Sequence, residues 1–267
     1  MQSEVERSAA RRILVTVAAI GTYAVFTFGR DWGLDLLGAP ERGEGAWFVR
    51  TAWFWGWTAL PAFVLAALLF GPYRLFSSLG LAANPLRGLA FAFLCTLPML
   101  VPLAVWGTWQ PGDLAPTLIG GAVLPGVLEE VVYRGMLFGF LFRFAGWGFF
   151  PAALVGALFF GPAHAFQGGS VGEAAGIVAV TALGAAWFAW LYAAWRNNLW
   201  VPIGFHVLMN AYWGVFAVSD TALGGPLGNG TRVAVIVLSI ILTTWWARRR
   251  GWTLPVKARG WRFERPA

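Results

Sequence analysis

Two adjacent glutamates in apolar surroundings are the first sign of chemistry in this sequence. Ten of the 12 acidic residues lie near the termini or in polar joints, whereas Glu129 and Glu130 lie near the middle of an apolar segment. An ionisable group there costs about 2.5–3.5 kcal/mol on insertion scales, so it usually faces the protein interior and has a function. The only two histidines, His164 and His206, also lie within or at the edge of apolar segments.

Helical spacing gives the two glutamates different surroundings. Glu130 and Arg134 are four residues apart, so on a helix their side chains can meet, with the carboxylate on the favourable N-terminal side. Glu129 is rotated by about 100° and has no such partner. We therefore expect Glu130 to be a paired, ionised support and Glu129 to be available as a general base. The alternative is that all three residues form one structural ion-pair cluster.

The histidines occur in two further short patterns. Asn210 follows His206 by four residues, which places both on one helix face, and His164 follows Phe160 at the same spacing. A histidine in a helix bundle also often hydrogen-bonds a neighbouring helix without any catalytic role. Together with the glutamates and the arginine, however, these side chains could supply a base, a group that orients water, and oxyanion donors.

Other hydrolytic chemistries lack their residues. The sequence contains neither His-Glu-x-x-His, as zinc proteases have, nor Gly-x-Ser-x-Gly, and every aspartate lies outside the apolar segments. The one cysteine, Cys95, excludes an internal disulfide and a multi-cysteine metal site, and its apolar surroundings indicate a packing residue. We expect no metal and no cofactor.

The composition indicates that lipid surrounds most of the elements that must position these residues. Hydrophobic residues make up 58% of the chain and charged residues 12%, half of the roughly 25% usual in soluble domains. The 17 tryptophans fit membrane interfaces. We predict an all-α, polytopic transmembrane bundle of about eight spans, at 13–29, 47–70, 88–106, 115–142, 149–166, 174–195, 199–218 and 231–247.

The first segment resembles a signal peptide only in its basic flank. Residues Thr27 to Arg30 offer no small-residue cleavage site, so we expect a retained helix. The chain has a net charge of +7, and seven of its 19 basic residues lie in the terminal run from Arg248 to Arg265, which indicates a contact with anionic lipid and not with nucleic acid.

The distribution of Arg and Lys predicts the orientation. With the N-terminus inside, fourteen basic residues lie on the inner side and four on the outer side. We therefore expect an integral protein of the cell membrane with both termini in the cytoplasm.

The three patterns, in this order on successive apolar segments, resemble the CAAX-protease and bacteriocin-processing family. They are Glu-Glu-x-x-x-Arg, Phe-x-x-x-His and His-x-x-x-Asn, and the resemblance extends over about residues 115–216. The family includes the type II CAAX prenyl endopeptidase and is described as glutamic-type intramembrane proteases. The resemblance implies three parts: N-terminal helices in 1–114, a catalytic core in 115–218, and the last helix with a basic tail in 219–267.

The resemblance also implies a role for each residue of the three patterns. Glu129 activates the attacking water with help from His164, Glu130 and Arg134 support that base, and His206 and Asn210 stabilise the oxyanion. Phe160 fills the aromatic position and packs. The implied partner is a membrane-associated or lipid-anchored protein or peptide substrate within the bilayer, whereas the oligomeric state is left open.

Two alternatives remain from the residues alone. A mid-membrane Glu and His pair also serves transporters and proton relays, and the same fold could act as a non-proteolytic immunity or scaffold protein. The span boundaries also place Glu129 near mid-membrane and His164 near the outer end of its span, so a tilted helix, a re-entrant stretch at Gly168-Gly169 or shifted boundaries must bring the two together. In addition, Gly161-Pro162 is expected to disturb the helix just before His164.

Overall fold

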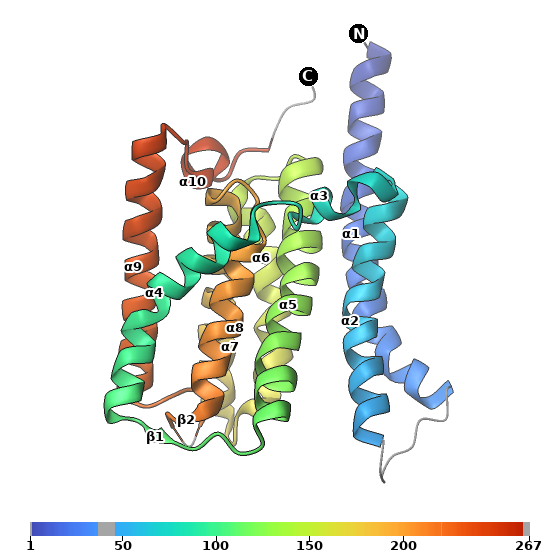
Figure 1. Ribbon diagram of the computed structural model, residues 1–267. Coiled ribbons are helices and arrows are strands. Elements are labelled where there is room, and N and C mark those ends of the chain that lie inside the picture. Colours follow the sequence, from blue (N-terminus) through green and yellow to red (C-terminus); the bar gives the residue numbers. More distant parts are fainter. Residues whose placement is uncertain (1, 37–45, 220, 264–267) are drawn as a thin grey trace.

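The computed structural model describes residues 2–36, 46–219 and 221–263, and it forms an all-α bundle (Figure 1). The first part of the chain contains α1 (Gln2–Leu36), α2 (Ala46–Phe70), η1 (Pro72–Arg74), α3 (Leu75–Leu79), α4 (Pro85–Trp106) and the short strand β1 (Thr108–Trp109). A continuous helix follows, made of η2 (Pro116–Val123), α5 (Leu124–Glu130), η3 (Val131–Phe138) and η4 (Phe140–Phe144). The remaining elements are α6 (Phe149–Phe160), η5 (Pro162–Gln167), α7 (Val171–Ala194), α8 (Trp200–Val215), β2 (Phe216–Ala217), α9 (Pro226–Arg250) and α10 (Pro255–Arg259).

The eight expected segments are all helical, and the structure confirms the all-α polytopic class. Six helices in the described part of the chain are long and apolar enough to cross a membrane: Ser8–Thr27, Thr51–Phe70, Pro85–Trp106, Phe149–Gln167, Val171–Ala194 and Pro226–Arg250. The two other segments carry Glu129, Glu130, Arg134, His206 and Asn210 of the candidate site. One is the helix from Pro116 to Phe144, which contains the buried charges, and the other is α8, which has 16 residues. Neither forms an uninterrupted helix of 18 residues, because α8 is short and π-helical turns interrupt the other segment.

Local sequence accounts for several helix ends. The Asn84 side chain accepts a hydrogen bond from the backbone N–H of Arg87 at 2.9 Å, and Pro85 occupies the first helical position of α4. Ser170 caps α7 in the same way through the N–H of Glu173. At the other end of the bundle, α9 finishes in three arginines and a left-handed Gly251.

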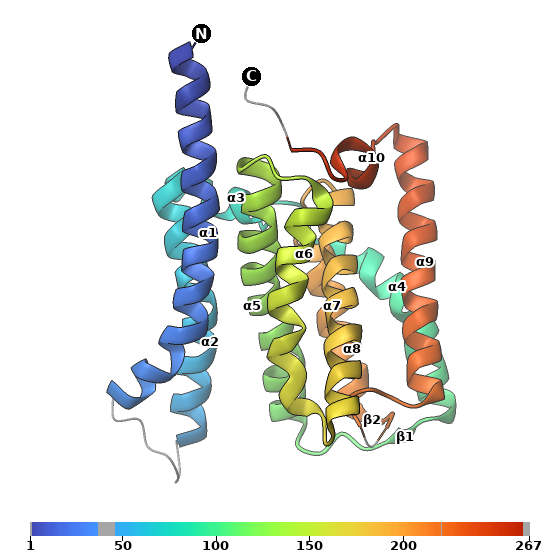
Figure 2. The same ribbon diagram turned by 180° about the vertical axis from the view of Figure 1, so that it is seen from behind.

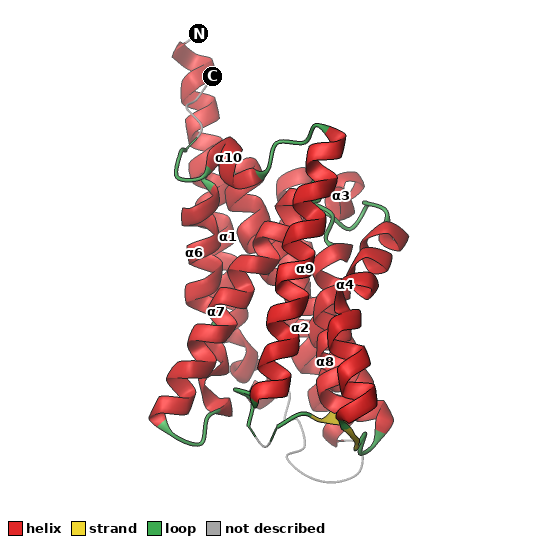
Figure 3. Cartoon of the chain, turned by 90° about the vertical axis from the view of Figure 1, so that its left-hand side faces the viewer, coloured by secondary structure: helices red, strands yellow, loops and turns green. Residues whose placement is uncertain are grey.

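The helices form a central group with a pair of helices on either side. Figures 1 and 2 show α1 and α2 as a hairpin on one side and α4 and α9 on the other, with α5, α6, α7 and α8 between them. The α4 helix crosses diagonally and packs on α8 and α9, while α2 packs on α5. Figure 3 shows the two strands at one end of the bundle, where β1 and β2 pair antiparallel.

The outer surface suits lipid and the interior is apolar. Large side chains such as Leu68, Leu158 and Leu183 point outward and are mostly exposed, as expected of a surface in contact with acyl chains. The start of α1 and the C-terminal α10 lie at the same end of the bundle (Figure 1), which requires an even number of crossings between them. With the composition, these features establish an integral, multi-pass membrane protein.

Candidate active site

The helix from Pro116 to Phe144 carries both glutamates and changes its winding beside them. α5 ends at Glu130, and the next eight residues form the π-helix η3, whose hydrogen bonds join residues five apart. Such π-helical turns are frequent at functional sites because they alter the direction in which side chains point. Here the side chain of Glu130 is fully buried, whereas that of the neighbouring Glu129 is 19% exposed.

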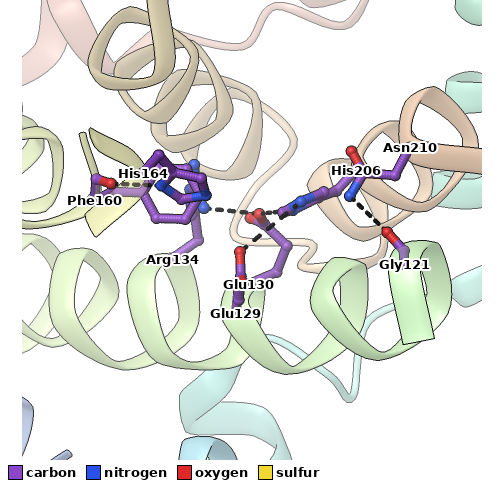
Figure 4. Close-up of polar contacts among 8 residues, drawn as sticks. All are labelled: Gly121, Glu129, Glu130, Arg134, Phe160, His164, His206 and Asn210. Carbon is purple, nitrogen blue, oxygen red and sulfur yellow. Dashed lines mark hydrogen bonds and ion pairs between the residues drawn. The ribbon is translucent and has the colours of Figure 1, made fainter. Parts of the chain in front are cut away.

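Glu130 has two cationic or polar neighbours. The Arg134 Nη1 donates to its Oε1 at 2.7 Å, which is the contact that the four-residue spacing indicates. The His206 Nδ1 lies 2.7 Å from the same oxygen and donates to it from α8 (Figure 4). Removing Glu130 would leave the buried Arg134 without its ion-pair partner, and breaking a buried pair in this way typically costs about 3–5 kcal/mol.

His206 lies between the two glutamates, which the sequence did not indicate. Its Nδ1 is bound to Glu130, and its Nε2 is 3.9 Å from the Glu129 Oε2, an ion pair when the imidazole is protonated. Glu129 therefore has a neighbour on another helix, although it has none on its own. Spacing within one helix can predict contacts on that helix, but this contact depends on how α5 and α8 cross.

Close approach of these two helices depends on a glycine. A Cβ at Gly126 would lie 2.8 Å from the backbone nitrogen of Val207 and 3.0 Å from its Cα. Contacts this short with backbone atoms do not occur, so any larger residue would push α8 away from α5. Gly126 thus sets the distance over which His206 reaches Glu130.

Asn210 lies on the same face of α8 as His206, as the spacing predicts. Its Nδ2 donates to the backbone oxygen of Gly121 at 3.2 Å, so the side chain is oriented by η2 (Figure 4). An amide nitrogen has two hydrogens. One N–H is therefore engaged by Gly121, and the other is available as a donor.

Pro162 explains the position of His164. Because proline lacks an N–H, α6 ends at Phe160 and the chain continues as the 3₁₀ helix η5, in which the His164 N–H donates to Gly161 at 3.0 Å. The His164 ring Nδ1 donates instead to the oxygen of Phe160 at 2.8 Å. This leaves the Nε2 of His164 as the nitrogen that can accept a proton. The expected disturbance before His164 is confirmed.

Phe160 connects the three patterns physically. Its ring centroid is 4.5 Å from that of His164 and 6.5 Å from that of His206, and the Arg134 guanidinium lies 4.6 Å from it. His164 and His206 therefore belong to one cluster, although the hydropathy boundaries placed His164 near a span end. The hydropathy boundaries describe neither the π-helix η2 before Glu129 nor the 3₁₀ helix η5 that carries His164.

Two aromatic residues of the cluster escaped the sequence reasoning. Phe188 on α7 lies 5.1 Å below the Arg134 guanidinium and 5.7 Å from the His206 ring. Tyr133 packs edge-on against Phe160, and its hydroxyl is 3.3 Å from that of Tyr23 on α1. Neither sits in a recognisable pattern. Four-residue spacing from Glu129 was the available signal for Tyr133, whereas Phe188 could only be found from the fold.

The comparisons with known proteins concern the segment that holds this cluster. Residues 111–212 match the family described as Type II CAAX prenyl endopeptidase Rce1-like. The chain is 33% identical over 95 residues to "Putative membrane peptidase YdiL" of Bacillus subtilis (strain 168), and the alignment covers 36% of this chain and 34% of that protein. The chain thus spans about a third of the length of the curated relative it matches. No solved structure matches. The resemblance to the CAAX-protease family is confirmed over the segment that contains all seven patterned residues.

Proposed function

We propose that the chain is an intramembrane endopeptidase that hydrolyses a peptide bond of a membrane-associated or lipid-anchored protein. The observation that carries the proposal is the contrast between the two glutamates. Glu130 is buried and held by Arg134 and His206, whereas Glu129 is partly exposed at the edge of the same cluster. Glu129 is thus the carboxylate that a water molecule and a peptide can reach.

In the proposed mechanism, Glu129 takes a proton from water as the oxygen attacks the scissile carbonyl carbon. The Nε2 of His164 accepts a hydrogen bond from the same water and orients it. The carbonyl oxygen becomes an oxyanion. It accepts hydrogen bonds from the Nε2–H of His206 and from the second N–H of Asn210. As the carbon–nitrogen bond breaks, Glu129 returns its proton to the leaving amine.

The supporting residues act through these groups. Glu130 accepts from the Nδ1 of His206 and so turns its Nε2 toward Glu129, while Arg134 compensates the charge of Glu130. Phe160 and Phe188 pack on the guanidinium and on the histidine rings, which limits their rotation. The Oε1 of Glu130 accepts from both Arg134 and His206, whereas its Oε2 is buried without a protein partner among the described residues. We propose that Glu129 acts without a metal ion.

We propose in addition that residues 115–218 form the catalytic unit and that the protein lies in the cell membrane with both termini in the cytoplasm. The basic residues at the end of the bundle that contains α10 support this orientation.

The purified protein provides the test, with a cleavable membrane peptide in detergent or liposomes. We expect turnover that a chelator leaves unchanged and that Glu129→Ala lowers by about 100-fold or more, the size of a lost general base. Glu173→Ala, a change of a partly exposed glutamate in the first turn of α7, serves as the matched control and should keep its activity. Full activity of Glu129→Ala would exclude the mechanism, and loss of activity with chelator would exclude its metal-independent part.

A further inference from the structure

We propose that substrates reach the catalytic residues from the extracytoplasmic half of the membrane. The substrate class is then a membrane-anchored peptide segment whose scissile bond lies in the outer half of the bilayer, and not a tail presented from the cytoplasm. This inference rests on the proposed peptidase function and on the proposed orientation.

Burial changes along the catalytic helix at the glutamates. From Glu130 to Phe142, toward the end with the basic residues, every position is buried. In the other direction the side chains of Val123 and Ile119 are 42% and 52% exposed, and Gly121, the partner of Asn210, is exposed. The continuously buried part of the helix therefore begins at Glu130, directly after the proposed catalytic Glu129.

The neighbouring helices repeat this gradient. On α8, residues 201–206 are buried and 207–211 are partly exposed, so that Asn210 falls in a more open stretch before Tyr212 and Val215, which are buried again. After His164, which is partly exposed, Phe166 is 81% exposed and the chain turns through the polar run Gln167-Gly168-Gly169-Ser170. On α7, Phe188 and the residues toward Tyr192 are mostly buried, and the first residues after Ser170 are mostly exposed.

At the opposite end of the bundle, where the basic residues lie, polar contacts link the helices to one another. The Arg143 guanidinium donates to the backbone oxygen of Ser78 and to the hydroxyl of Tyr192 at 2.7 Å, linking η4 to α3 and α7. Arg259 of α10 donates to the oxygen of Phe142 at 2.9 Å. A peptide approaching Glu129 from this end would have to break these contacts and displace a fully packed core.

Charge assigns the two ends to the two sides of the membrane. Arg74, Arg143 and Arg196 lie at the closed end together with the arginines that finish α9. The open end carries Asp113 before the catalytic helix, Glu173 in the first turn of α7 and one arginine, Arg232, near the start of α9. Basic residues remain on the cytoplasmic side of most membrane proteins, so the closed end faces the cytoplasm and the open end faces outward.

The open end also offers a place for an extended peptide. β1 follows α4 and β2 directly follows α8, and within the described residues each strand has an outer edge that no third strand covers. Edges of this kind bind extended peptides through main-chain hydrogen bonds. The exposed Trp109 of β1 adds an apolar contact suited to a segment leaving the membrane.

Cysteine accessibility tests the direction of access without requiring activity. The only cysteine of the chain is the buried Cys95, so Cys95→Ala provides an unreactive background. In it, Tyr73→Cys reports on the closed end, Asp113→Cys on the open end and Asn210→Cys on the site. A membrane-impermeant maleimide applied to intact cells is expected to label Asp113→Cys and Asn210→Cys, and to label Tyr73→Cys only after permeabilisation. Labelling of Tyr73→Cys in intact cells, or an Asn210→Cys that fails to label while Asp113→Cys does, overturns the proposal.

Two reporter substrates test the substrate class. Each is a single-pass membrane protein with the same cleavable segment, placed at the outer or at the inner boundary of its span. We expect at least ten-fold more Glu129-dependent cleavage of the outer reporter, and preferential cleavage of the inner one overturns the proposal. If Asn210→Cys labels from outside but neither reporter is cut, the direction of access stands and the assigned substrate class and peptidase function both fail.

Discussion

At the scale of residues, the two adjacent glutamates have different proposed roles: Glu130 supports the site and Glu129 acts as the base. Sequence spacing was sufficient to pair Glu130 with Arg134, because both lie on one helix. It could not show His206 between Glu129 and Glu130, since that contact is made across two helices. The roles of the two carboxylates can therefore be distinguished by the free energy of unfolding of their variants as well as by activity.

Removing Glu130 should destabilise the protein far more than removing Glu129. Glu130→Ala leaves Arg134 buried without its partner and should lower the free energy of unfolding by about 3–5 kcal/mol. Glu129→Ala removes a partly exposed group with one distant neighbour and should cost less than about 1 kcal/mol. Unfolding of the purified proteins in detergent measures both values. Equal losses for the two variants would contradict the division.

At the scale of elements, a break between α6 and η5 positions His164. Pro162→Ala supplies an N–H that can bond to Leu158, so α6 can continue and the His164 N–H can take the Phe160 oxygen from the ring. We expect peptidase activity to fall by about 10–100-fold, because small displacements of catalytic groups have effects of this size. Stability should stay the same or rise.

The matched control for this variant is Pro151→Ala. Pro151 lies in the first turn of the same helix, where its missing N–H has no partner to lose. Both activity and stability should be retained. A Pro162→Ala variant as active as Pro151→Ala would show that the break does not position His164.

The crossing of α5 and α8 makes a second prediction at this scale. Gly126→Ala places a methyl group against the backbone of Val207 and should separate His206 from Glu130, with a loss of about 1–3 kcal/mol in stability and a lower rate. Gly156→Ala, in α6, meets nothing within 4 Å and should gain up to about 1 kcal/mol, since alanine favours a helix. The melting temperatures of the two variants should change in opposite directions, and the rate should fall only in Gly126→Ala. Similar behaviour of both would contradict the role of Gly126.

At the scale of the whole molecule, hydropathy predicted the order of the helices, but it did not predict their winding or the contacts between them. All eight expected segments are helical, because apolar runs of this length have few other stable forms in lipid. The π-helical winding after Glu130, the ribbon of β1 and β2, and the place of Phe188 beside Arg134 depend on packing between distant segments. The patterns therefore located the cluster, while the fold supplied its geometry and its open side.

Cleavage in the cell gives the most direct measurement of the central claim. Membrane-protein termini can be compared by mass spectrometry between cells that carry the wild-type chain and cells that carry Glu129→Gln at equal abundance. The account predicts new termini, within or beside membrane-spanning segments, that appear only with the wild-type chain. Identical termini in the two samples, with both proteins folded in the membrane, would contradict it.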